Sequence, residues 1–146
     1  MNRIFTLVII FAFTFSFNLK AQNSFRFKDQ RKSRQVVKFN LINNLIVIPV
    51  EINGKELTFI LDSGVTRVIL FNNLKNDSIT LMDVEEIQLQ GLGKGEPVES
   101  LISRNNKISI KNITSDNEVI YVILNDYFDL SSKMGVTIHG IIGYNF

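Results

Sequence analysis

From residue 35 onward the sequence is a succession of short apolar runs separated by turn-forming residues, and this pattern most constrains the fold. The runs are rich in Val, Ile and Leu, and hardly any stretch repeats its apolar residues at helical spacing. One short helix or irregular connection is predicted, over residues 125–135. The pattern therefore indicates an all-β domain, with strands predicted over residues 36–41, 45–52, 55–61, 66–71, 84–90, 98–103, 108–113 and 118–124.

Two hairpins are predicted within this succession. Asn53-Gly54 separates the second and third runs, and both residue types tolerate the positive φ of a two-residue hairpin turn. The return strand, 55–61, is apolar at its end, so we expect it to deliver Asp62 to the interior of the domain. A second, longer hairpin is predicted around residues 91–97, a glycine-rich stretch between two further strands.

Residues 1–21 have the composition of a signal peptide. Arg3 precedes an uncharged apolar run over residues 4–17, and the segment ends in the small residue Ala21. The run is too short for a membrane span, so an uncleaved anchor is the weaker alternative. We therefore expect an exported protein, periplasmic or secreted, with no stable membrane span after signal removal. Residues 22–34 are predicted to be a basic, flexible leader, which could be a removable pro-segment.

Charge and residue types exclude several functions. The chain has 16 Lys and Arg, two of them in the signal segment at Arg3 and Lys20, so 14 basic residues face 14 acidic ones after its removal. A neutral domain is not expected to bind nucleic acid, since the basic residues of the leader precede the patterned region. There are no cysteines and one histidine, His139, so no metal site and no cofactor are predicted.

The candidate for chemistry is Asp62, which follows the apolar residues Phe59-Ile60-Leu61 and precedes Ser63-Gly64-Val65-Thr66. A carboxylate at the end of an apolar strand is poorly solvated, and Gly64 lets the backbone bend closely around it. The bare tripeptide Asp-Ser-Gly is also an ordinary turn, and in a plain β-sandwich Asp62 would be exposed. A second apolar motif, His139-Gly140-Ile141-Ile142-Gly143, follows the long hairpin.

These two motifs, in this order around a glycine-tipped hairpin, resemble the retropepsin-like aspartic peptidases, including exported bacterial members with one Asp-Ser-Gly motif per chain. The resemblance implies a β-barrel over residues 35–146 with a flap hairpin that closes over a peptide or protein substrate. It implies Asp62 as the catalytic residue. The other implied site residues are Ser63, Gly64 and Thr66 in the active-site loop, Gly91, Leu92 and Gly93 in the flap, and Ile141, Ile142 and Gly143 in the second motif.

The sequence departs from the family pattern at three places. Ser63 stands where Thr is commoner, and Val65 stands where Ala is commoner. The chain ends at Phe146, where family members continue into a helix and a last strand of the dimer interface. We therefore expect a domain that is truncated at its C-terminal end. It would be a fragment of a longer protein, with a PDZ domain following as in bacterial relatives, or a degenerate copy.

Aspartic peptidase chemistry needs two facing carboxylates that share one proton and hold a water between them. With one Asp-Ser-Gly motif per chain, the resemblance implies a homodimer in which Asp62 meets Asp62 of the second copy, active at acidic to mildly acidic pH and without metal. The alternative is a catalytically inactive peptide-binding or structural β-domain with the same fold. A serine triad is disfavoured because Ser63 lacks the Gly-x-Ser-x-Gly setting.

Overall fold

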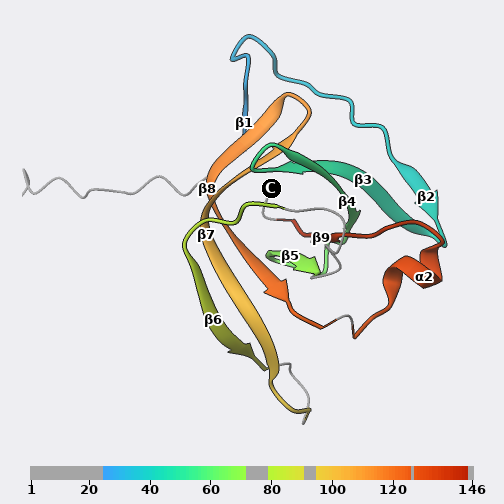
Figure 1. Ribbon diagram of the computed structural model, residues 1–146. Coiled ribbons are helices and arrows are strands. Elements are labelled where there is room, and N and C mark those ends of the chain that lie inside the picture. The colour runs from blue at the N-terminus through green and yellow to red at the C-terminus, as the bar shows by residue number, and fades with distance from the viewer. Residues whose placement is uncertain (1–24, 72–78, 91–94, 126, 145–146) are drawn as a thin grey trace, which may run out of the picture.

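The computed structural model describes residues 25–71, 79–90, 95–125 and 127–144, and within them the chain is almost entirely β-structure (Figure 1). The predicted all-β class is confirmed. Apart from the short helix α2, the described elements are strands that form one curled sheet. In chain order the elements are β1 Arg26–Phe27, β2 Asn40–Ile42, β3 Leu45–Ile52, β4 Lys55–Leu61, β5 Val68–Phe71, β6 Val84–Leu89, β7 Val98–Ile110, β8 Ile113–Ile123, α2 Leu130–Met134 and β9 Gly140–Ile142.

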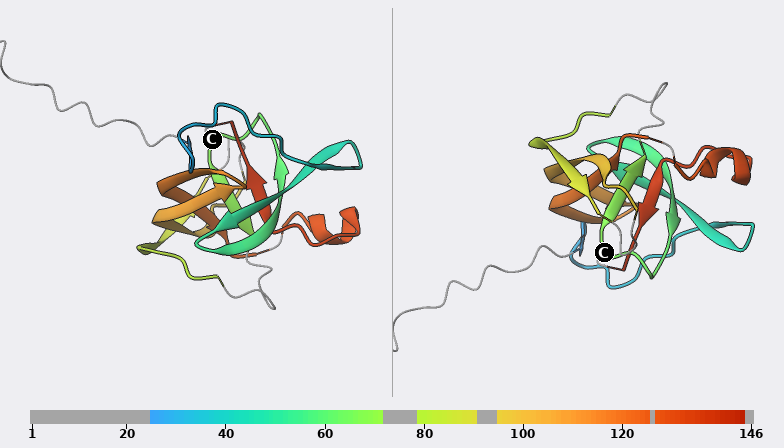
Figure 2. Two further views of the ribbon diagram at one scale, coloured as in Figure 1. Left: turned by 90° about the horizontal axis from the view of Figure 1, so that it is seen from above. Right: turned by 90° about the horizontal axis from the view of Figure 1, so that it is seen from below.

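Six of the strands close into a barrel. The sheet order runs β1-β8-β5-β9-β4-β3-β7-β6, and β7 pairs with β8 as well as with β3 and β6. The ring β8, β5, β9, β4, β3 and β7 therefore has no free edge within it. Figure 2 shows the closed shape from above and from below, with the β2–β3 hairpin and α2 projecting from one side.

The barrel interior is the main hydrophobic core, and every strand of the ring contributes to it. Phe59, Leu70 and Ile142 are examples from β4, β5 and β9, and all three are fully buried. A second core cluster lies on the outer face of the same strands, where Ile60 and Phe71 pack with Met134 of α2. β4 is therefore buried on both faces, which explains its incomplete alternation of apolar and polar residues.

The β3–β4 hairpin matches its prediction to the residue. Its register runs from Ile46 opposite Leu61 to Ile52 opposite Lys55. Asn53 and Gly54 connect the strands with φ values of 49° and 89°, as the predicted two-residue turn requires. β4 ends at Leu61, so the register of this hairpin determines where Asp62 leaves the sheet.

β9 lies between β4 and β5, the two strands that flank the Asp62 loop. It runs parallel to β4, with Ile142 opposite Leu61, and antiparallel to β5, with Ile141 opposite Ile69. The second motif therefore enters the sheet next to the first. Two parallel strands need a long connection between them. The chain between β4 and β9 includes β5 to β8 and α2.

The main differences between the predicted and the observed strands concern β2, β7 and β8; β8 begins at Ile113, five residues before the predicted 118–124. Residues 36–39 lie outside any strand, and β2 covers only Asn40–Ile42. The separate strands predicted over 98–103 and 108–113 are one strand, β7, with an irregular pairing between Ser103 and Ile108. The turn to β8 lies at Lys111, whose φ is 53°, so the prediction placed a strand across it.

The β6–β7 hairpin occupies the place predicted for the flap, and Val84 pairs with Ser103 at its base. Its predicted tip residues Gly91, Leu92 and Gly93 lie outside the described residues. The predicted signal peptide, 1–21, also lies outside them. No helix in the described ranges is long and apolar enough to cross a membrane.

The sequence predicts a flexible leader, but the part of it that the structure describes is held against the barrel. Arg26 and Phe27 form β1, which pairs with Thr114 and Ile113 at the start of β8. Arg26 also forms an ion pair with Asp116. The signal for this strand is weak because it has two residues and depends on β8, a distant partner, for its hydrogen bonds.

Candidate active site

The residues Asp62, Ser63 and Gly64 form a turn that closes on the Asp62 carboxylate. The backbone N–H of Gly64 donates to Asp62 Oδ1 at 2.8 Å, and the N–H of Val65 donates to the Asp62 carbonyl oxygen at 3.2 Å. The Gly64 bond holds one carboxylate oxygen, Oδ1, in place. The turn therefore orients the carboxylate rather than merely reversing the chain.

The second motif holds this turn by direct backbone contact. Asp62 N–H donates to the Ile142 carbonyl at 3.0 Å, and Tyr144 N–H donates to the Val65 carbonyl at 3.1 Å. A Cβ on Gly143 would lie 1.7 Å from the Val65 oxygen, far inside contact distance. Only a residue without a side chain lets the strand pass this close to the loop.

Gly140 has the same role at the other end of β9. A Cβ there would lie 2.2 Å from the Ile69 carbonyl oxygen of β5 and 2.5 Å from the Phe59 ring of β4. The two glycines therefore bracket Ile141 and Ile142 and let β9 fit between its neighbours.

His139 is a buried structural residue. It lies in an irregular segment just before β9 and is only 6% exposed. Its Nδ1 accepts a hydrogen bond from Thr58 N–H at 2.9 Å, and its backbone bonds to both Thr58 and Phe71. His139 thus links β4 to β5, a role that no local sequence pattern indicates.

The active-site loop is exposed in the single chain. Asp62, Ser63, Gly64 and Thr66 are all exposed, and Val65 is half-buried. The expectation that the hairpin delivers Asp62 to the interior is wrong for one chain, because β4 ends at the barrel rim and the loop leaves the sheet there. Within the described ranges, no group of three or more His, Cys, Asp or Glu could hold a metal ion.

An apolar row lies beside the loop on the outer face of the barrel. Ile60, Ile141 and Ile69 stand directly opposite one another across β4, β9 and β5. Ile141 and Ile69 are half-exposed, whereas Ile60 is buried. Phe71, two residues beyond Ile69, contacts Phe128 with ring centroids 5.9 Å apart. Ile141 belongs to the predicted second motif, whereas no sequence motif marks Ile69 or Phe128.

The structure brings together all the predicted site residues that it describes. Asp62, Ser63, Gly64 and Thr66 form one loop, and Ile141, Ile142 and Gly143 lie against it. Thr66 is next to the closest contact, which is at Val65: a Cβ on Gly143 would lie 3.1 Å from the Thr66 backbone nitrogen. The flap residues of the prediction remain outside the described ranges.

Comparisons with known proteins bear on the fold. A family model described as aspartyl protease matches residues 48–146. Among solved structures, the chain is similar to a retropepsin-like aspartic protease from Rickettsia conorii, with 14% identity, a TM-score of 0.53, and coverage of 84% of this chain and 80% of that chain. It is also similar to EIAV protease complexed with the inhibitor HBY-793, with 20% identity, a TM-score of 0.40, and coverage of 70% and 98%. No curated protein matches the chain. The predicted retropepsin-like fold is therefore confirmed.

Proposed function

We propose that this chain, which belongs to the aspartyl protease family, is an endopeptidase with Asp62 as its catalytic carboxylate. The observation that carries the proposal is the position of Asp62 at the end of β4. There the Gly64 amide orients its carboxylate and β9 fixes the loop from behind. A plain surface turn would need neither the Asp62 to Ile142 hydrogen bond nor the close contact at Gly143.

We propose further that the active form is a homodimer. The reaction needs two carboxylates, one ionised and one protonated, because two like charges at close range do not both ionise. The exposure of Asp62 and Ser63 at the barrel rim supports this assembly, since a second copy can reach them. A two-fold axis through the loop would bring Asp62 of each copy face to face.

In the proposed reaction the ionised Asp62 removes a proton from a water held between the two carboxylates. The resulting hydroxide attacks the scissile carbonyl carbon, while the protonated Asp62 of the other copy donates its proton to the carbonyl oxygen. The tetrahedral gem-diol then collapses: the amide nitrogen takes the proton that the first Asp62 received from the water, the C–N bond breaks, and one hydroxyl of the gem-diol returns its proton to the second Asp62. The products are a carboxylic acid and an amine, and the dyad again holds a single proton. The Gly64 amide would keep the carboxylate in position through these steps.

The substrate we propose is a peptide or protein segment in extended conformation. The half-exposed Ile69 and Ile141 offer apolar contacts for its side chains beside Asp62. The β6–β7 hairpin is the element we propose as the flap above it. On the basis of residues 1–21, we also propose that the protein acts after export, in the periplasm or outside the cell.

The test is cleavage of a mixed peptide library between pH 3 and 8, at several protein concentrations, by the native chain and by Asp62→Asn. We expect Asp62→Asn to lower the rate by about a thousandfold or more while the protein stays folded. The matched control is Asp83→Asn, an exposed aspartate with φ of 41°, a conformation that Asn also tolerates. It should leave cleavage unchanged.

The concentration series tests the homodimer. We expect the rate per chain to rise with protein concentration until the dimer is fully populated, and cleavage to survive a metal chelator. Asp62-independent cleavage, or cleavage that the chelator abolishes, would contradict an aspartic peptidase. A folded protein that binds library peptides but never cleaves them would instead be the inactive peptide-binding domain.

A further inference from the structure

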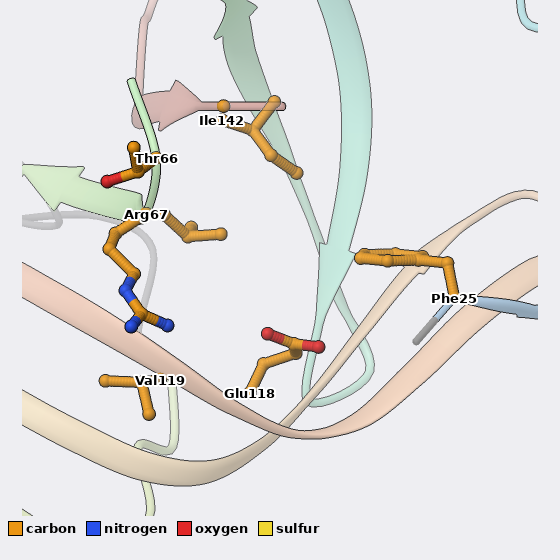
Figure 3. Close-up of a pocket in the computed structure, with 8 residues that line it drawn as sticks. Phe25, Thr66, Arg67, Glu118, Val119 and Ile142 are labelled. Carbon is orange, nitrogen blue, oxygen red and sulfur yellow. The ribbon is translucent and has the colours of Figure 1, made fainter. Parts of the chain in front are cut away.

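We infer that Phe25, the residue just before β1, is a positioning residue for the active-site loop. Phe25 is half-buried and packs against the barrel core, which includes Val68 and Ile142. It also lines a small cavity of about 20 Å³ directly behind the loop, together with Thr66, Arg67 and Gly143. Figure 3 shows the Phe25 ring across this cavity from Thr66 and Arg67.

The cavity backs the part of the molecule that holds Asp62. Gly143, which lines the cavity, makes its closest approach to the loop at Val65, and Thr66, also in the cavity wall, is the next residue of that loop. Ile142, which accepts the Asp62 N–H hydrogen bond through its carbonyl oxygen, lies in the same cavity wall. A side chain that fills the opposite wall limits how far the end of β9 can move away from the loop.

Three further contacts hold Phe25 in this position. β1 pairs with the start of β8 at Thr114 and Ile113. The Arg26 guanidinium pairs with the Asp116 carboxylate, and Lys28 N–H donates to the Asn112 carbonyl at 2.7 Å. The ion pair is largely exposed, so it adds little stability by itself. Its effect is to fix the direction of the short strand that follows Phe25.

The inference predicts that loss of the Phe25 ring loosens the loop more than the rest of the barrel. In Phe25→Ala we expect the amides of Asp62, Gly64 and Val65 to exchange hydrogen about tenfold faster, with the β3–β4 hairpin amides far less affected. Phe25→Leu should restore most of the protection, because it refills the cavity wall. Phe39→Ala is the matched control, since Phe39 is 57% exposed and belongs to neither core cluster.

The kinetic consequence rests on the proposed function. If Asp62 is catalytic, Phe25→Ala should lower kcat by about tenfold with little change in KM, because substrate contacts stay in place while the carboxylate is less well oriented. Hydrogen exchange tests the positioning role whether or not the chain cleaves peptides, so failure of the one proposal is distinguishable from failure of the other.

Asp116→Ala provides a milder second variant in case Phe25→Ala does not fold. This variant removes the carboxylate that pairs with Arg26 and leaves the core unchanged. The same loop amides should lose protection to a smaller degree. The inference is overturned if the loop amides keep their protection in both folded variants. It is also overturned if all barrel amides accelerate equally, since that result would show only general destabilisation.

Discussion

Gly143 is the residue at which the loop and the second motif come into contact through their backbones. The Val65 carbonyl oxygen accepts a hydrogen bond from Tyr144 N–H on one side of this contact. On the other side it lies where a Gly143 side chain would begin. The sequence identified Gly143 from the motif alone, and the structure supplies the physical reason for a glycine there.

Gly143→Ala should therefore destabilise the protein strongly. The added methyl group would overlap backbone rather than a movable side chain, so we expect a loss of about 3 kcal/mol or more in the free energy of unfolding. Urea denaturation followed by circular dichroism measures it. Gly95→Ala is the control, because a Cβ there meets nothing within 4 Å and should change stability by less than about 0.5 kcal/mol. Equal stabilities for the two variants would contradict the close contact.

At the scale of elements, sequence patterns predicted the features that depend on residues close together in the chain. The β3–β4 hairpin followed from two apolar runs and from Asn53-Gly54, and both motifs of the site were found because each is a contiguous stretch. β7 was missed as one strand because the polar residues 104–107 read as a turn. The position of β9 between β4 and β5 depends on pairings distant in sequence, so no local pattern could predict it.

The polar stretch in β7 is stabilised by Asn106, whose side chain is fully buried. Its Nδ2 donates to Ser103 Oγ at 2.8 Å, and its Oδ1 accepts from Asn53 Nδ2, also at 2.8 Å. Asn53 belongs to the β3–β4 turn, so these bonds tie the base of the β6–β7 hairpin to the hairpin that leads to Asp62. A buried amide with its hydrogen bonds made can replace regular ladder pairing at an irregular position.

Asn106→Leu should be destabilising because it removes the buried bond to Ser103 Oγ and the bonds that Asn53 Nδ2 and Met82 N–H donate to Asn106 Oδ1. We expect a loss of about 3 kcal/mol, since each stranded buried donor or acceptor costs roughly 1–3 kcal/mol. Thermal unfolding at fixed protein concentration is the measurement. The neighbouring Asn105→Gly serves as the control, because Asn105 is exposed with φ of 58°, a conformation that glycine adopts freely. If the leucine variant and the control variant unfold at the same temperature, the hydrogen bonds of Asn106 have no role in stability.

At the scale of the whole molecule, the N-terminal segment is part of the folded unit from Phe25 onward. Figure 1 shows it leaving β1 and running around the barrel to β2. The Asn112 side chain donates to Gln35 Oε1 at 3.0 Å, and Val37 packs against the main core. The basic residues between these contacts are exposed, so they lie on a section of chain fixed at both ends.

Brief digestion with trypsin tests this arrangement. Within residues 25–35 we expect the first cuts after Arg31, Lys32 or Arg34, which are exposed and outside any strand, and slow cutting after Arg26 in β1. Mass spectrometry of the earliest fragments identifies the sites. Preferred cleavage after Arg26 would mean that β1 is not held against β8 in solution.

The place of β9 in the barrel also sets the order in which the active site can form as the chain is made. Synthesis proceeds from the N-terminus, so β4, the Asp62 loop and β5 leave the ribosome well before Gly140–Ile142. Until that strand arrives, the gap between β4 and β5 is open and the loop lacks the Ile142 and Tyr144 hydrogen bonds. A nascent chain therefore carries its candidate catalytic residue long before it can hold it in place, and any product that stops short of β9 has the aspartate without the site.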